Sequence, residues 1–307
     1  MSKIAFLFPG QGSQRPGMGD GFLASQVAAE AFEEANDRLG FDLQKLCMEG
    51  PADQLTLTQH AQPAILTVSV IAFRVMVERM EITPLAAAGH SLGEYSALVA
   101  AGVLDFGDAV EAVYYRGKYM QEAVPVGQGG MAAILGMNAA DLEELCAAEA
   151  KGQFVAPANY NCHGQIVISG HLEAVQRVLA RAKGKLLEVS APFHSQLMAP
   201  AAALLNERLK GLNFEDAAWP IVTNAENRHL RRGSDFLDSL VLQVTAPVRW
   251  DTGVGAMIDE GADAFIEFGE GKVLSGLMKR IDKTKPVYSC SSIEEADNLY
   301  DLISEYL

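Results

Sequence analysis

The chain contains few cysteines, and their spacing excludes several classes of protein. Only four occur in 307 residues, at positions 47, 146, 162 and 290, and no two are close enough to form a Cys-X-X-Cys pair. This spacing gives no support to a zinc site or to a disulfide framework. Scattered cysteines in a chain of this length are typical of a cytoplasmic protein whose thiols are reduced.

Basic residues are also scarce. The chain has 24 Lys and Arg against 39 Asp and Glu, which gives a formal net charge of -15 at pH 7. A surface this acidic repels phosphate backbones and anionic lipids. Binding to nucleic acid or to a membrane surface is therefore not expected.

The apolar stretches are too short or too interrupted to cross a membrane. Ile4–Phe8 ends at Pro9-Gly10, so it is shorter than a signal-peptide core and predicts a buried strand. The stretch 63–80 is interrupted by Ser69 and Arg74, which favours a buried core helix over a membrane span. The composition, 49% hydrophobic and 21% charged, is that of an ordinary globular protein.

Strands and helices alternate along the first part of the chain. Strand Ile4–Phe8 precedes a glycine-rich loop and a predicted helix over 27–39. A second strand, 84–88, ends at a tight turn before a predicted helix over 94–101. This order is typical of an α/β fold.

The pattern changes in the middle of the chain, where the order becomes β-α-β-β-α-β. That order is the ferredoxin-like unit. We therefore expect an inserted ferredoxin-like subdomain over 127–191. Residues 1–126 and 192–307 are expected to form a large α/β-hydrolase-like domain with a mostly parallel sheet, to which strands near 220–223 and 264–268 return.

The pentapeptide Gly89-His90-Ser91-Leu92-Gly93 matches the nucleophile elbow, in which a serine lies on a strained turn between a strand and a helix. The following helix N-terminus presents backbone N–H groups that stabilise an oxyanion. The pattern predicts Ser91 as the nucleophile of an acyl-transfer enzyme. The alternative is a chance Gly-Ser turn, which the strand-turn-helix context disfavours.

A serine nucleophile needs a base, and six histidines are available. They are His60, His90, His163, His171, His194 and His229. His90 is adjacent to Ser91, but neighbours on such a turn point apart. His194 follows the inserted unit, where a cleft between two domains is expected, and this position gives it a modest lead over His163 and His229.

Two further features are candidates for binding groups. Backbone N–H groups in the loop 9–12, which follows the first strand, could complete an oxyanion hole with the N–H of Leu92, although a plain loop is the alternative for these residues. Arg116 lies mid-helix between Tyr115 and Gly117, where its planar fork suits a carboxylate. The alternative for Arg116 is an exposed helix arginine.

Six segments occur in the order typical of one enzyme family. They are Pro9-Gly10-Gln11-Gly12, Gly89–Tyr95, Tyr115-Arg116-Gly117, Asn159–Gly170, Pro192-Phe193-His194-Ser195 and Gly269–Leu274. Together they make the chain resemble the malonyl-CoA:acyl carrier protein transacylases of bacterial fatty acid synthesis over essentially its whole length. His163 and Glu270 stand where the family often has proline, which puts only local loop shape in question.

The resemblance implies a transfer in two steps. Ser91 takes the malonyl group from coenzyme A as an ester, and the phosphopantetheine thiol of acyl carrier protein then attacks that ester. His194 is the base and then the acid. The family's partner for this histidine is a backbone carbonyl, which maps to Gln243.

The resemblance also implies the remaining groups of the site. The backbone N–H groups of Gln11 and Leu92 form the oxyanion hole, and Arg116 holds the free carboxylate of malonate. No metal or cofactor is implied, because the coenzyme A thioester is a substrate and the partner carries the phosphopantetheine. We expect a free-standing, cytoplasmic monomer.

Two other classes of protein compete with this interpretation. An esterase or lipase would use the same elbow with an acid between serine and histidine in the sequence, and would have no carboxylate clamp. A catalytically idle scaffold would bind a carrier protein without turnover, and the presence of Ser91, His194 and Arg116 argues against it.

The acidic surface opposes long-range attraction of an acidic carrier unless a local basic patch offsets it. The candidate residues are Arg228, Arg231, Arg232, Arg249, Lys272, Lys279 and Arg280. They form either a docking surface or a set of scattered, solvated charges, and the sequence leaves both possibilities open.

Overall fold

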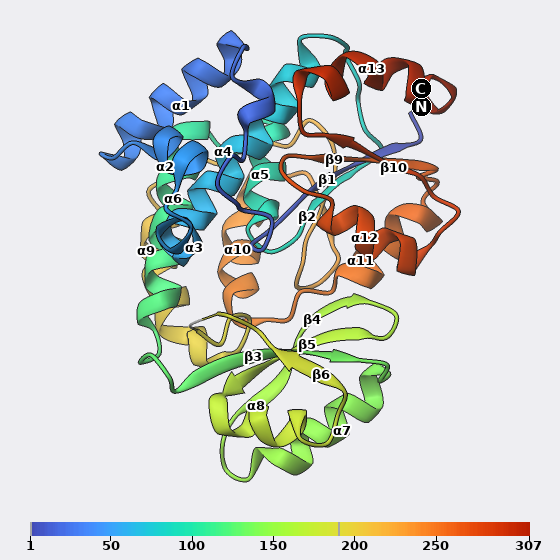
Figure 1. Cartoon of the computed structure of the whole chain (residues 1–307). Coiled ribbons are helices and arrows are strands. Elements are labelled where there is room, and N and C mark those ends of the chain that lie inside the picture. Colours follow the sequence, from blue (N-terminus) through green and yellow to red (C-terminus); the bar gives the residue numbers. More distant parts are fainter. Residues whose placement is uncertain (1, 190) are drawn as a thin grey trace.

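The structure is a computed structural model that describes residues 2–189 and 191–307. Met1 and Ser190, which fall inside the expected domain boundaries, lie outside the described residues. Two sheets organise the chain, one of six strands in the order β10-β9-β1-β2-β7-β8 and one of four in the order β4-β5-β3-β6. The larger sheet and its helices lie above the smaller sheet in Figure 1. An α/β fold with a mostly parallel sheet is thus confirmed.

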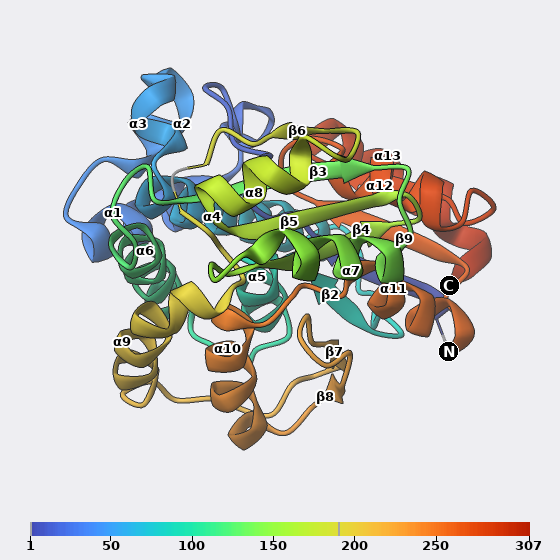
Figure 2. The ribbon, with the colours of Figure 1, turned by 90° about the horizontal axis from the view of Figure 1, so that it is seen from below.

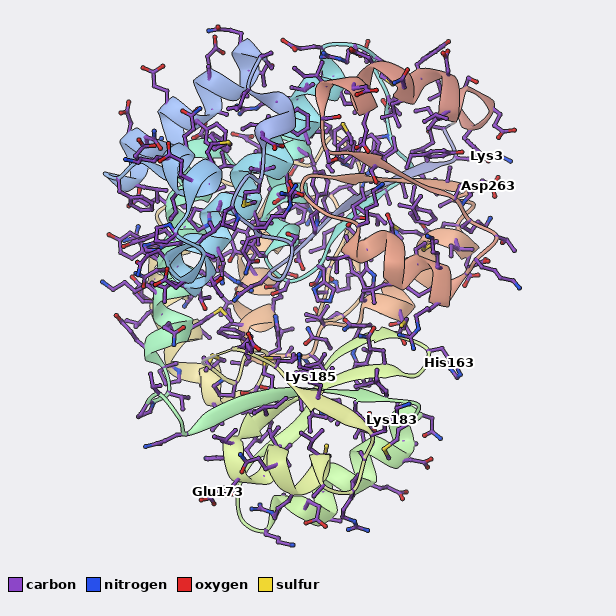
Figure 3. All side chains as sticks on the ribbon, viewed as in Figure 1. Lys3, His163, Glu173, Lys183, Lys185 and Asp263 are labelled. Atoms are coloured by element: carbon purple, nitrogen blue, oxygen red, sulfur yellow. The ribbon has the colours of Figure 1, made fainter. Side chains whose placement is uncertain are left out.

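The centre of the larger sheet is built on the first apolar run. β1 (Ile4–Phe8) pairs in parallel with β2 (Ala87–Gly89) on one side and with β9 (Ala264–Phe268) on the other. All five residues of β1 are buried, as expected for a parallel strand covered on both faces. At the start of these strands, Lys3 forms an ion pair of 2.9 Å with Asp263 (Figure 3).

The edges of this sheet are less regular. β7 (Ile221–Val222) and β10 (Val287–Cys290) extend the parallel sheet, and β8 (His229–Leu230) pairs antiparallel with β7. The sequence predicted β1 and β9 with these bounds but missed β8 and β10. β8 has only two residues, which is too short for an alternation of apolar and polar residues to be detected. Three of the four residues of β10 are only partly buried.

The apolar helix α4 (Thr58–Val77) is the core helix of this part of the molecule. It begins five residues before the expected start and keeps Pro63 inside it. Loss of one backbone hydrogen bond at Pro63 is offset by packing, since most of the helix is buried. The helix is long and apolar enough to cross a membrane, but 78% of its most apolar window is buried inside the molecule, which is the pattern of a core helix.

Ten further helices surround the larger sheet. They are α1 (Gln26–Leu39), α2 (Leu43–Glu49), α3 (Ala52–Thr56), α5 (Gly93–Ala100), α6 (Phe106–Glu122), α9 (Ala199–Leu209), α10 (Phe236–Thr245), α11 (Trp250–Asp259), α12 (Val273–Ile281) and α13 (Ile293–Ile303). The four cysteines of the chain are all buried and unpaired.

The smaller sheet is antiparallel and carries two helices on one face (Figure 2). Its elements are β3 (Gly129–Leu135), α7 (Ala139–Ala150), β4 (Val155–Cys162), β5 (Gln165–His171), α8 (Leu172–Leu179) and β6 (Gly184–Leu186). β4 is joined to the larger part of the chain by backbone hydrogen bonds. The N–H of Tyr160 donates to the carbonyl of Val248, and the N–H of Val248 donates to the carbonyl of Ala158, both at 2.8 Å.

Two glycines allow the segment from β2 to α5 to pack against the end of β1. A Cβ atom at Gly93 would lie 2.1 Å from the carbonyl oxygen of Phe8. A Cβ atom at Gly89 would lie 1.9 Å from the carbonyl carbon of Gly93. Only glycine fits at either position, so the first turn of α5 rests directly on the backbone that leaves β1.

Gly93→Ala is expected to lower the free energy of unfolding by more than about 2 kcal/mol, because the added methyl group clashes with backbone that cannot yield. Gly276→Ala is the matched control, since a Cβ atom at this position in α12 would meet nothing within 4 Å. It should leave stability unchanged or raise it by up to about 1 kcal/mol, the helix preference for alanine. Urea unfolding of both variants measures the difference, and equal losses would contradict the packing argument.

Candidate active site

The candidate site lies at the carboxyl ends of three neighbouring strands of the larger sheet. Gln11 follows β1, Ser91 follows β2 and Asn224 follows β7. Open α/β sheets bind ligands at this edge, because loops from adjacent strands converge there. The smaller sheet closes the site from the other side through Asn161 of β4, whose side-chain oxygen lies 2.9 Å from Nε2 of His90.

Ser91 occupies the strained turn that the sequence predicted. Its φ of 52° lies in the left-handed region, which a residue with a Cβ atom adopts only when its surroundings hold it there. Asn224 provides that hold. Its Oδ1 accepts from the N–H of Ser91 at 2.6 Å, and its Nδ2 donates to the carbonyl of Gly89 at 2.7 Å.

A hydrogen-bonded chain connects Ser91 to the backbone of α10. Oγ of Ser91 lies 2.7 Å from Nε2 of His194, and Nδ1 of His194 lies 2.9 Å from the carbonyl oxygen of Gln243. A carbonyl only accepts, so Nδ1 carries the proton and Nε2 is free to accept from the serine hydroxyl. The geometry is that of a serine and base pair oriented by a third group, here a neutral carbonyl.

The environment keeps His194 neutral. Burial, followed by the positive charge of Arg116, lowers the pKa of His194 from 6.5 to about 3. The hydrogen bond to Gln243 acts in the opposite direction and is outweighed. At neutral pH the imidazole is therefore ready to accept a proton.

Arg116 is the buried cation of the site. Its side chain is 1% exposed, and its guanidinium donates to Oε1 of Gln62 at 2.8 Å, to Oε1 of Gln243 at 2.9 Å and to Oγ of Ser91 at 3.1 Å. These partners are all neutral, and no carboxylate of the described residues forms an ion pair with Arg116. Its Nε has no partner among them.

Close packing of two helices places Arg116 at this point. A Cβ atom at Gly117 would lie 2.6 Å from the carbonyl oxygen of Thr58, so α6 touches the backbone of α4 where Gly117 has no side chain. The contact brings Arg116 of α6 alongside Gln62 of α4. The alternative interpretation of Arg116 as an exposed helix residue is wrong.

The two predicted oxyanion donors lie on loops in direct contact. A Cβ atom at Gly10, next to Gln11, would lie 2.3 Å from the carbonyl oxygen of His90. The backbone N–H groups of Gln11 and Leu92 donate to no acceptor within residues 2–189 and 191–307. Both groups are available to a ligand oxygen beside Ser91.

Glu94 and the Gln243 side chain form a second layer below these groups. Glu94 is fully buried, and its Oε2 accepts from Nε2 of Gln243 at 2.8 Å and from the N–H of Asn224 at 3.0 Å. Burial raises the pKa of Glu94 to about 7. Gln243 thus contributes its carbonyl to His194 and its amide to Arg116 and Glu94.

The surroundings of the other candidate histidines distinguish them from His194. His163 is exposed at the turn between β4 and β5, where Figure 3 shows it pointing outward. His229 pairs with Glu260 at 3.0 Å, and Nδ1 of His171 lies 2.9 Å from the N–H of Phe154. Across the described ranges, no group of three or more His, Cys, Asp or Glu is arranged to hold a metal ion.

Hydrogen bonds bring together four of the six predicted site residues, Ser91, His194, Arg116 and Gln243. Leu92 follows Ser91 in the chain, and Gln11 lies next to Gly10, which packs against the backbone of His90. Three further contributors were missed. The sequence analysis assigned no role to Gln62, Asn224 or Glu94. Glu94 did carry a signal, since it is an acid within the apolar start of α5. Gln62 and Asn224 carried none, because their contacts come from segments distant in sequence.

The fold and the site together define a serine-dependent acyl-group enzyme of the α/β class. The acyl transferase domain family matches residues 5–293. The chain belongs to this family, and its relatives are malonyl CoA-acyl carrier protein transacylases, which confirms the resemblance found in the sequence.

Curated relatives and solved structures agree on this family. The transacylase of Escherichia coli strain K12 is 47% identical over 291 residues, covering 92% of this chain and 94% of the relative. That of Bacillus subtilis strain 168 is 46% identical over 313 residues, covering 99% and 98%. A solved malonyl-transacylase in complex with a type II PKS acyl-carrier protein superposes with a TM-score of 0.95 at 41% identity, covering 98% of this chain and 100% of that one.

Modification of Ser91 by a serine-directed sulfonyl fluoride should remain fast from pH 7 down to about pH 5, because His194 stays neutral until the pH approaches its lowered pKa. In Arg116→Ala the acid limb should move to higher pH, because the second largest of the causes that lower the pKa of His194 is removed. Inactivation rates measured against pH test this. An inactivation rate that falls with its midpoint near pH 6.5 in the unaltered protein would contradict the lowered pKa of His194.

Proposed function

We propose that this protein transfers a malonyl group from malonyl-CoA, through an ester on Ser91, to the phosphopantetheine thiol of acyl carrier protein, and so supplies fatty acid elongation. Its relatives are malonyl CoA-acyl carrier protein transacylases, and one solved relative binds an acyl-carrier protein. The protein is an acyltransferase of this activity.

One observation supports a malonyl rather than an acetyl substrate. Arg116 is a fully buried cation with neutral partners, and its Nη2 lies 3.1 Å from Oγ of Ser91. A buried charge without a counter-ion is costly. A carboxylate on the acyl group would supply the counter-ion beside the nucleophile.

In the first half-reaction, Nε2 of His194 takes the proton of the Ser91 hydroxyl as Oγ attacks the thioester carbonyl. The oxyanion that develops is stabilised by the N–H groups of Gln11 and Leu92. The tetrahedral intermediate collapses with cleavage of the carbon–sulfur bond. His194 returns its proton to the sulfur, and coenzyme A leaves as a thiol.

In the second half-reaction the carrier's thiol repeats these steps in reverse order. His194 removes the thiol proton, sulfur attacks the ester carbonyl, and the same two N–H groups hold the oxyanion. Cleavage of the ester bond returns the proton from His194 to Oγ of Ser91. The enzyme is regenerated, and the two thiols never occupy the site together.

We further infer the finer description of the molecule. The strand order β4-β5-β3-β6 supports a ferredoxin-like subdomain over 127–191, set into an α/β-hydrolase-like domain of residues 1–126 and 192–307. We infer a cytoplasmic monomer that needs no metal or cofactor of its own and binds neither nucleic acid nor membrane. The net charge of -15 supports the last point.

Docking of the carrier on basic residues stays a prediction. Arg249 and Arg280 lie near the junction of the two sheets. Arg249 packs over the ring of Tyr160, and Arg280 donates to the carbonyl oxygen of His163 at 3.5 Å. Arg228 pairs with Glu226 at 3.7 Å and is less free to meet an acidic partner.

Labelled malonyl-CoA should leave a covalent label on Ser91, and the label should move to acyl carrier protein when the holo-carrier is added. Mass spectrometry of the trapped acyl-enzyme and of the carrier measures both steps, with Ser91→Ala as the control. Release of label as free malonate would indicate a hydrolase. The absence of label on Ser91 would indicate a scaffold.

Arg116→Ala should lower kcat/KM for malonyl transfer by about 100-fold or more, because removing one partner of a buried ion pair costs roughly 3–5 kcal/mol. Acetyl transfer should be spared, since an acetyl group has no carboxylate. Arg208→Ala is a suitable control. Arg208 packs over the ring of Tyr115, the residue before Arg116, and makes no contact with the site. Equal losses for both acyl groups would mean that Arg116 is only structural.

A further inference from the structure

We propose that Glu94 is a positioning residue that sets selectivity for a carboxylate-bearing acyl group, by fixing the Gln243 amide against the guanidinium of Arg116. The proposal rests on the transfer function proposed above. It concerns a buried acid that the two half-reactions leave unused.

Three groups form a continuous buried chain. Oε2 of Glu94 accepts from Nε2 of Gln243 at 2.8 Å, and Oε1 of Gln243 accepts from Nη2 of Arg116 at 2.9 Å. All three side chains are at most 1% exposed. Water therefore does not compete for these hydrogen bonds, and the orientation of each group is set by its neighbours.

The glutamine amide has two ends, and Glu94 decides which one faces Arg116. A carboxylate offers only acceptors, so it selects the NH2 end of the amide. The oxygen end is then left for the guanidinium, which offers only donors. If the amide turned over, its NH2 group would face Arg116, and two donors would meet in a buried space at a cost of about 1–3 kcal/mol.

The interposed glutamine also separates the two charges. Glu94 lies one side chain away from Arg116, behind Gln243, so it does not occupy the guanidinium directly. Gln62 and Gln243 hold the two ends of the fork beside Ser91. A substrate carboxylate then meets a cation that is fixed in orientation but not yet paired.

This arrangement matters only for an acyl group that reaches Arg116. A misdirected guanidinium would weaken binding of a malonyl carboxylate. Nε2 of Gln243 also donates to the carbonyl oxygen of Ser91 at 3.1 Å, so acetyl transfer would fall as well. It would fall by less, because Ser91 keeps its hydrogen bonds to His194 and Asn224 and an acetyl group forms no ion pair with Arg116. A general structural role for Glu94 would instead lower both activities by the same factor.

Glu94→Met tests the proposal. One oxygen of Glu94, Oε2, accepts from both Nε2 of Gln243 and the N–H of Asn224, and methionine removes this acceptor, so the Gln243 amide is no longer held with its oxygen towards Arg116. We expect kcat/KM for malonyl transfer to fall about tenfold, the effect of one lost hydrogen bond to a charged group. Acetyl transfer should change much less, so the malonyl-to-acetyl ratio falls.

Glu267→Met is the matched control. Glu267 is also fully buried, and it accepts from the N–H groups of Leu274 and Ser275 and from the Ser275 hydroxyl at the start of α12. None of these partners belongs to the site. This variant should leave the malonyl-to-acetyl ratio unchanged, whatever its effect on stability.

A second variant decides the case if Glu94→Met does not fold. Gln243→Met keeps the backbone carbonyl for His194 and removes the amide, so it should show the same selective loss. Where all variants fold, the double variant should lose no more than either single one, because both changes break the same chain.

An unchanged ratio in Glu94→Met, or in Gln243→Met, would overturn the proposal, as would losses in the double variant that simply multiply. The unaltered enzyme is assayed beside them. If it forms no malonyl ester on Ser91, the proposed transfer function itself has failed.

Discussion

The rest of the site depends on one constraint, the burial of a guanidinium next to a serine hydroxyl. Arg116 is fully buried, and the molecule satisfies it with neutral oxygens from Gln62, Gln243 and Ser91. Its positive charge helps to keep the base, His194, neutral. In the proposed reaction the same charge binds the carboxylate of the substrate. Losing this cation would therefore alter both the acyl group that is accepted and the pH range in which the base works.

The backbone, more than the side chains, sets the precision of this centre. Gly10, Gly89 and Gly93 allow the backbone after β1, the turn around Ser91 and the start of α5 to touch without side chains between them. The strained φ of Ser91 is held by Asn224, which reaches it from a neighbouring strand. Rigid strands thus position groups that a flexible loop would hold less accurately.

The sequence predicted the class of fold and the elbow because both rest on local patterns, a continuous apolar strand and a Gly-flanked serine before a helix. Its position gave His194 only a modest lead over His163 and His229, and only a family resemblance pointed to the Gln243 carbonyl. Glu94 and Asn224 were missed because their roles depend on contacts between residues more than 120 positions apart. The domain boundaries and the catalytic roles stay predictions.

The burial of all four cysteines acquires a meaning once the substrates are considered. An exposed thiolate exchanges readily with thioesters and disulfides, and this enzyme handles a thioester and two thiols in every cycle. Burial raises the pKa of Cys47, Cys146 and Cys290 to about 12, and it raises that of Cys162 as well. The four thiols therefore stay protonated and do not compete for the acyl group, which in the proposed reaction is carried by an oxygen, that of Ser91.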